Sequence, residues 1–130
     1  MEEPRPLLTV ESLIVEYTLG SHVSRVLDAL SFTARSGELV LALGPSGCGK
    51  TTLLSVLAGL LRPTAGNLRF GDLEVEELRG DDLLEYRRRR VGVVFQAFNL
   101  VPSLTALENV MAPLVLTGTR PAPALSLIHI

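Results

Sequence analysis

Cysteine, tryptophan and lysine are nearly missing from this chain of 130 residues. It contains one cysteine, no tryptophan and, among twelve Lys and Arg residues, a single lysine, Lys50. One cysteine excludes an internal disulfide and any cysteine-based zinc site, and suits a reducing cytosol. No apolar run approaches the roughly 18 residues that a membrane-spanning helix needs. Because arginine supplies nearly all the positive charge, we expect Lys50 to lie where an arginine would not work.

An excess of positive charge is also missing. Twelve basic and fourteen acidic residues give a net charge of −2, and the pI is about 5.7. This balance gives no general attraction to nucleic acid, so we expect no nucleic-acid partner. The run Arg87–Arg90 has no interleaved aromatic residues and indicates a solvated helix end. The content of 47% hydrophobic and 20% charged residues is that of a globular domain.

The spacing of apolar residues predicts an α/β domain. Alternation indicates strands over residues 7–18, 29–35 and 67–70, with a loop over 19–24. Two short, continuously apolar runs, 39–43 and 91–95, are typical of parallel strands covered on both faces. Helices are predicted over 50–61, ended by Pro63, and over 81–90. A capping box of Thr105 and Glu108 starts another through about residue 110, which Pro113 bends or ends.

The strongest motif joins the first apolar run to the first helix. Residues 44–51 match G-x-x-x-x-G-K-[ST], the pattern of a phosphate-binding loop: Gly44, Pro45, Ser46, Gly47, Cys48, Gly49, Lys50 and Thr51. Glycines let backbone N–H groups turn toward phosphate oxygens. The Lys50 ammonium can reach the β- and γ-phosphates, and the Thr51 hydroxyl can bind Mg²⁺. The alternative is a chance glycine-rich turn that caps an ordinary helix.

Two segments together resemble a known family. GPSGCGKTTLL (residues 44–54) looks like the Walker A loop of ATP-binding cassette (ABC) ATPases, and VFQAFNLVPSLTALENV (94–110) looks like their Q-loop and the segment after it. The resemblance covers about residues 8–118. The stretch 87–114 is particularly similar to the subgroup that serves lipoprotein release and macrolide or peptide export. The resemblance implies a P-loop NTPase fold: a RecA-like core with a parallel sheet and an antiparallel β subdomain.

The resemblance also assigns roles to residues, with ATP and Mg²⁺ as the ligands. Tyr17 would stack on adenine, although it could instead pack within the accessory sheet. Gln96 would offer its amide oxygen to Mg²⁺ or to the attacking water, at the seam with a membrane partner; the alternative is a polar residue that ends a strand. Thr52 would support the loop through its hydroxyl, or is simply an early-helix threonine. Cys48 fills a free position of the loop.

The family function implied is that of an ATP-binding subunit of an ABC transporter. Such a subunit dimerises around nucleotide and couples Mg-ATP hydrolysis to export or lipoprotein release by a separate membrane permease, at the cytoplasmic face of the membrane. In the family a Walker B acidic strand, an LSGGQ signature and a downstream switch histidine complete the site. None is found in these 130 residues. We therefore expect a fold truncated before the second half of the core, which binds ATP without hydrolysing it.

Two other functions remain open: a non-transport ABC protein, and a short nucleotide-binding module without hydrolysis. The domain assignment places residues 1–124 in the N-terminal part of one ABC ATPase domain. Residues 125–130, LSLIHI, resemble the translation of an adapter used in transposon-based sequencing libraries. They are expected to be a non-native tail, the alternative being a genuine apolar tail that forms a short strand.

Overall fold

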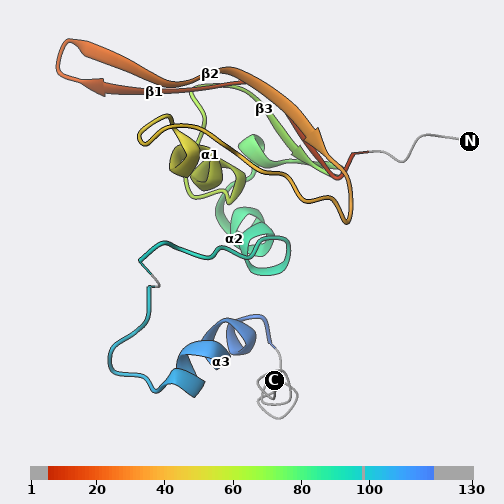
Figure 1. The fold of residues 1–130 in the computed structure, drawn as a ribbon. Coiled ribbons are helices and arrows are strands. Elements are labelled where there is room, and N and C mark those ends of the chain that lie inside the picture. The colour runs from red at the N-terminus through yellow and green to blue at the C-terminus, as the bar shows by residue number, and fades with distance from the viewer. Residues whose placement is uncertain (1–5, 98, 119–130) are drawn as a thin grey trace, which may run out of the picture. The chain divides into compact units, whose positions relative to one another are not determined.

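The chain divides into two compact units, Met1–Leu84 and Glu85–Ile130. The structure is a computed structural model, and it describes residues 6–97 and 99–118 (Figure 1). The first unit carries a β-sheet, a short helix and the phosphate-loop motif. Residues 125–130, for which a non-native tail was expected, lie outside the described residues.

The first unit is built on an antiparallel sheet with the strand order β2-β1-β3-β4. The strands are β1 (Leu8–Leu19), β2 (His22–Ala34), β3 (Ala65–Phe70) and the short β4 (Leu73–Glu74), followed by a 3-10 turn over Val75–Glu77. The antiparallel subdomain is thus confirmed. The loop expected over residues 19–24 was wrong, because Leu19 pairs directly with His22 across a two-residue turn. Gly20 has φ 62° there, a conformation that suits glycine in hairpin turns.

Bulges interrupt the long β1–β2 pairing. Val15 pairs with Leu27, but the next residue of β1, Glu16, pairs with Arg25. Val26 is therefore an extra residue on β2, without a partner in the ladder. A bulge of this kind bends a strand and changes where its neighbours point, and bulges are common beside functional sites. This one lies next to the phosphate loop.

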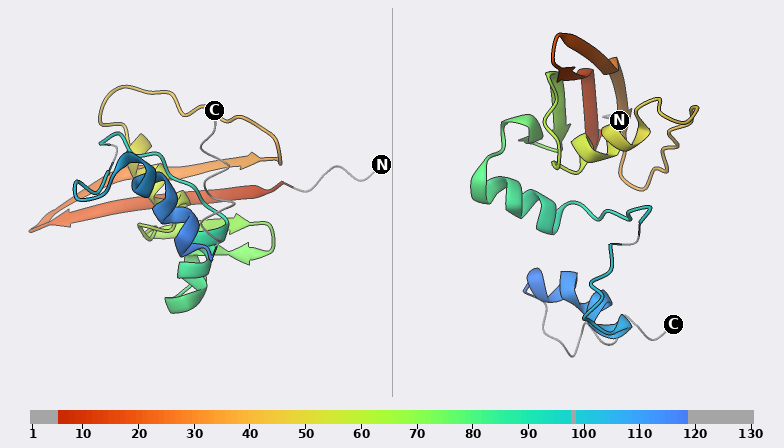
Figure 2. Two further views of the ribbon diagram at one scale, coloured as in Figure 1. Left: turned by 90° about the horizontal axis from the view of Figure 1, so that it is seen from below. Right: turned by 90° about the vertical axis from the view of Figure 1, so that its left-hand side faces the viewer.

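Helix α1 (Lys50–Leu57) lies beside the sheet and supplies the other half of the core (Figure 2). Its Leu53 and Val56 are buried, as are five residues of the sheet: Val10, Leu13, Val15, Leu27 and Leu68. The helix ends at Leu57, earlier than the end near residue 61 that the position of Pro63 suggested. Gly59 N–H donates to the Val56 carbonyl at 2.9 Å, and Leu60 N–H to the Ser55 carbonyl at 2.8 Å. This pair of bonds around a left-handed glycine ends a helix without proline.

The two parallel strands that the sequence predicted are not formed. Residues 39–43 and 91–95 have no strand pairing among the described residues. Leu39 is 84% exposed, Leu43 86% and Val94 97%. A strand buried on both faces is stabilised by neighbours in its sheet, and its apolar side chains alone do not hold it in place. The parallel part of the predicted fold is therefore absent from residues 6–97 and 99–118.

Two α-helices follow β4 in the described part of the chain. Helix α2 (Gly80–Arg89) has acidic residues in its first turn and arginines in its last, the order that the helix dipole favours. Residues 88–90 are exposed, in agreement with the predicted solvated helix end. Helix α3 (Ala106–Leu116) begins with the expected capping box. Two hydrogen bonds from Thr105, first from its backbone N–H and then from its hydroxyl, lower the pKa of Glu108. Pro113 neither ends nor shortens α3, which runs to Leu116.

Candidate nucleotide-binding site

The phosphate-loop motif forms an exposed loop that leads into α1. Residues 44–48 are exposed, whereas Gly49, at the N-cap of α1, is buried with φ 97°. A Cβ atom on Gly49 would lie 2.9 Å from the Val26 carbonyl oxygen and 3.0 Å from Leu27 Cδ2. Only glycine fits this close approach in a left-handed conformation. The bulged strand β2 thus fixes where the loop ends and the helix begins.

Lys50 folds back over the loop. Its Nζ donates hydrogen bonds of 2.7 Å to the carbonyl oxygens of Gly44 and Pro45, and lies 3.5 Å from Cys48 Sγ. The only lysine of the chain therefore holds its positive charge at the loop and at the first residue of α1. Helix N-termini favour negative charge, so the lysine and the helix end together form an electropositive centre.

The two threonines after Lys50 lie in the first turn of α1. Thr51 is exposed and Thr52 is half-buried. Among residues 6–97 and 99–118 there is no cluster of three or more His, Cys, Asp or Glu residues that could hold a metal ion. Mg²⁺ bound to a nucleotide keeps several waters and takes phosphate oxygens with few protein ligands. The exposed Thr51 hydroxyl therefore fits a magnesium ion that arrives with its nucleotide.

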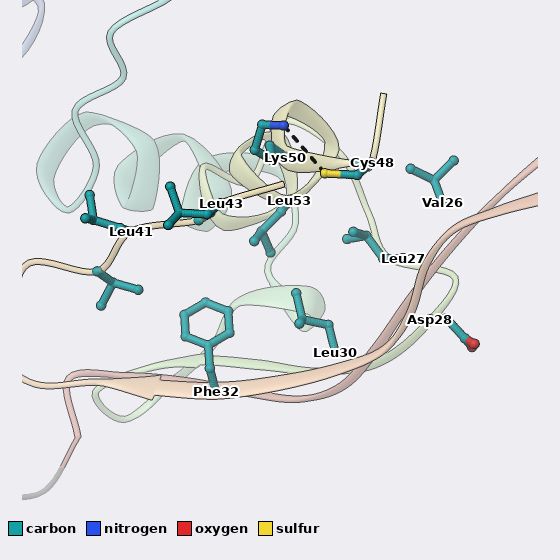
Figure 3. A pocket seen from close by; sticks show the side chains of 13 residues that line it. Val26, Leu27, Asp28, Leu30, Phe32, Leu41, Leu43, Cys48, Lys50 and Leu53 are labelled. Atoms are coloured by element: carbon teal, nitrogen blue, oxygen red, sulfur yellow. Dashed lines mark hydrogen bonds between the residues drawn. The ribbon is translucent and has the colours of Figure 1, made fainter. Parts of the chain in front are cut away.

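A cavity of about 470 Å³ lies beside the loop (Figure 3). Lys50 and Cys48 are at one side of it, and the other walls are apolar side chains of β2, residues 40–43 and α1: Leu27, Leu30, Phe32, Leu41, Leu43 and Leu53. Hydrocarbon walls do not stabilise phosphate charge. The polar face of the loop, and not this cavity, is therefore the part suited to a nucleotide.

Tyr17 lies on the same hairpin that contacts the loop. Its side chain is 46% exposed, near the end of β1, and Ser24 of β2 is its cross-strand partner. Two residues further along β2, the Val26 carbonyl approaches Gly49. Tyr17 is therefore not buried in the sheet, and nearly half of its surface is accessible to a ligand. Stacking on a base remains a prediction.

An ion network lies on the same hairpin as Tyr17. The Arg25 guanidinium contacts Glu16 Oε1 at 2.7 Å and Asp28 Oδ1 at 2.8 Å. Hydrogen bonds with Asp28 and then Glu16 raise the pKa of Arg25. Sequence analysis missed this network, because the bulge at Val26 decides which residues face each other across the hairpin. A motif search gives no signal for such a bulge.

Gln96 lies in the other unit. It is exposed, in a turn after residues 91–95, and the phosphate loop belongs to the first unit. Its role toward Mg²⁺ or water therefore remains a prediction. No helix in the described part of the chain is both long and apolar enough to cross a membrane.

Comparison with known proteins gives a consistent match. The family model described as "ABC transporter" matches residues 27–128. The uncharacterised ABC transporter ATP-binding protein Rv2564 of Mycobacterium tuberculosis is 56% identical over 117 residues, which are 90% of this chain and 36% of the relative. The lipoprotein-releasing system ATP-binding protein LolD of Anaeromyxobacter dehalogenans is 42% identical over 125 residues, or 95% of this chain and 52% of LolD.

A solved structure matches the fold as well. A dimeric structure of the ATP-binding cassette MJ0796, bound to ADP and Pi, superposes with a TM-score of 0.85 at 33% identity. The match covers 92% of this chain and 53% of MJ0796. The chain thus has the fold of an ABC ATPase cassette, and it spans about a third to a half of the length of these relatives.

Proposed function

This chain belongs to the ABC transporter family, and from that membership we propose that it is the nucleotide-binding part of a transport ATPase subunit. The observation that carries the proposal is the position of Lys50. Its ammonium lies at the N-terminus of α1, within 2.7 Å of two carbonyl oxygens of the loop. Phosphate oxygens of a bound nucleotide would compete for the same ammonium and for the N–H groups of the loop.

Each remaining residue of the site would contact a different part of Mg-ATP. Thr51 would bind the Mg²⁺ that accompanies the phosphates, and Thr52 would support the loop. Tyr17 would stack on the adenine, since its ring is accessible and an aromatic face suits a planar base. For Gln96 we propose the role that the family implies, an amide oxygen offered to Mg²⁺ or to the attacking water. When bound, Mg²⁺ would neutralise phosphate charge during transfer of the γ-phosphoryl group to water.

Hydrolysis is a property of the family, and we propose that these 130 residues bind ATP without hydrolysing it. The sequence has no run of four apolar residues followed by an acid, the pattern that supplies the general base in the family, and it has no LSGGQ. A general base accepts the proton of the attacking water, so we expect no hydrolysis without one.

The proposed partners follow from the relatives. MJ0796 was solved as a dimer, and the name of LolD describes a lipoprotein-releasing system. By analogy, a second ATPase subunit and a membrane permease would be the partners here, with lipoprotein release or export as the transport process. The subunit would then work at the cytoplasmic face of a membrane, held there by its permease.

Titration calorimetry with Mg-ATP tests the proposal. Lys50→Met should weaken binding roughly a hundredfold, because a charge-assisted interaction with phosphate is worth about 2–3 kcal/mol. Lys50→Arg should not restore it, since a planar fork does not replace a compact ammonium. The control is Arg69→Gln, which removes a positive charge from β3 and should leave the affinity unchanged. Equal affinities for the wild-type and Lys50→Met chains would refute the proposal.

A further inference from the structure

Arg25 connects two strands and also spans a bulge. Its Nε donates to Glu16 Oε1 at 2.7 Å, which ties β2 to β1. Its Nη1 donates to Asp28 Oδ1 at 2.8 Å, three residues further along β2. Between them lies Val26, the extra residue of the bulge. The guanidinium therefore bridges the bulge along β2, through Asp28, and also links β2 to β1, through Glu16.

The neighbours of this network touch both ends of the proposed nucleotide site. Tyr17 directly follows Glu16 in β1, and successive side chains of a strand point to opposite faces, so the Arg25–Glu16 pair acts on the tyrosine through the backbone of the hairpin. Val26 lies within the span from Arg25 to Asp28, and its carbonyl stands against Gly49 at the end of the phosphate loop. The segment of β2 from Ser24, the partner of Tyr17, to Val26, the neighbour of Gly49, thus includes Arg25 itself.

A nucleotide has a covalent span between its base and its phosphates, so both contacts have to be in place at once. We infer that Arg25 is a positioning residue, which sets the base-stacking Tyr17 at the right place relative to the phosphate loop. The inference rests on the proposed function. Its consequence is selective: Arg25 contributes to the affinity for a nucleotide that carries a base and not to the affinity for a bare phosphate chain.

The test compares two ligands on the full 130-residue chain. Calorimetry gives the dissociation constants of Mg-ATP and of Mg-tripolyphosphate, which fills the loop but has no base. Arg25→Gln should weaken Mg-ATP binding about three- to tenfold, which lies within what two solvent-accessible ion pairs can contribute together, and change tripolyphosphate affinity less than twofold. Glu16→Gln and Asp28→Asn should each shift the ratio of the two constants in the same direction by less. Tyr17→Ala should shift it at least as far as Arg25→Gln.

Arg69→Gln is the matched control. Arg69 lies in the same sheet and approaches Glu11 at 3.9 Å and Glu74 at 3.8 Å, without contacting the bulge. Its replacement should leave the ratio unchanged. Two results would overturn the inference. One is an unchanged ratio of the two dissociation constants in Arg25→Gln, which includes an equal loss of affinity for both ligands. The other is the same shift of the ratio in Arg69→Gln. Failure of the proposed function looks different, since the unmodified chain would then bind neither ligand or Lys50→Met would bind both normally.

Discussion

Lys50 and Cys48 lie together at the entrance of the phosphate loop. Cys48 is a free, exposed thiol, and its Sγ is 3.5 Å from Lys50 Nζ. Any group attached to this sulfur would lie next to the ammonium that we propose for phosphate binding. The chain has one cysteine, so a thiol reagent can act at this position alone.

Alkylation of Cys48 with iodoacetamide should therefore abolish Mg-ATP binding, and prior Mg-ATP should protect the thiol from the reagent. Mass spectrometry follows the modification and calorimetry follows the binding. Cys48→Ser is the control, because serine is nearly the same size and should bind Mg-ATP with or without the reagent. A fully alkylated chain that retains its ATP affinity would exclude the loop as the nucleotide site.

The sheet depends on one close approach between β1 and β3. Gly66 of β3 has φ 92°, and a Cβ atom on it would overlap the Ser12 carbonyl oxygen and lie 2.7 Å from Leu13 Cα. Both obstacles are backbone atoms, which cannot turn aside as a flexible side chain can. Leu13 is fully buried, so a displacement at this point would disturb the core between the sheet and α1.

Gly66→Ala should lower the free energy of unfolding by about 3 kcal/mol, from overpacking added to the left-handed conformation. Gly71→Ala is the matched control, since Gly71 has φ 58° with open space around it. It should cost only about 1 kcal/mol, the conformational part. Urea denaturation measures both values. Equal losses in the two variants would show that the contact with Ser12 does not matter.

Local signals made some elements predictable. The Thr105–Glu108 capping box and the glycine-rich loop before Lys50 depend on residues close together in sequence, and both are where they were expected. The bulge at Val26 depends on the opposite strand, and so could not be predicted. The composition of the runs 39–43 and 91–95 predicts buried strands. That prediction assumes neighbours in a parallel sheet, which the described residues do not provide.

Residues 39–43 form an exposed apolar segment of the first unit. Leu39 and Leu43 are more than four-fifths exposed, and the backbone of this segment has no strand partner in the described part of the chain. Exposed apolar segments without backbone partners are templates for association with other chains.

Leu39→Lys should therefore reduce aggregation, measured by light scattering, without lowering the melting temperature by more than about a degree, since exposed positions contribute little to stability. The buried Leu68 provides the contrast. Leu68→Ala should cost about 2–5 kcal/mol, the usual range for a core leucine. A large loss of stability in Leu39→Lys would mean that residues 39–43 are packed in solution.

One loop of the first unit is proposed to bind nucleotide phosphates around Lys50. A titration of the isotope-labelled chain with Mg-ATP, followed by amide chemical shifts in NMR spectra, tests this binding. We expect the largest shifts in residues 44–52 and around Tyr17. Shifts confined to α3, or to the apolar walls at Leu30 and Phe32, would refute it.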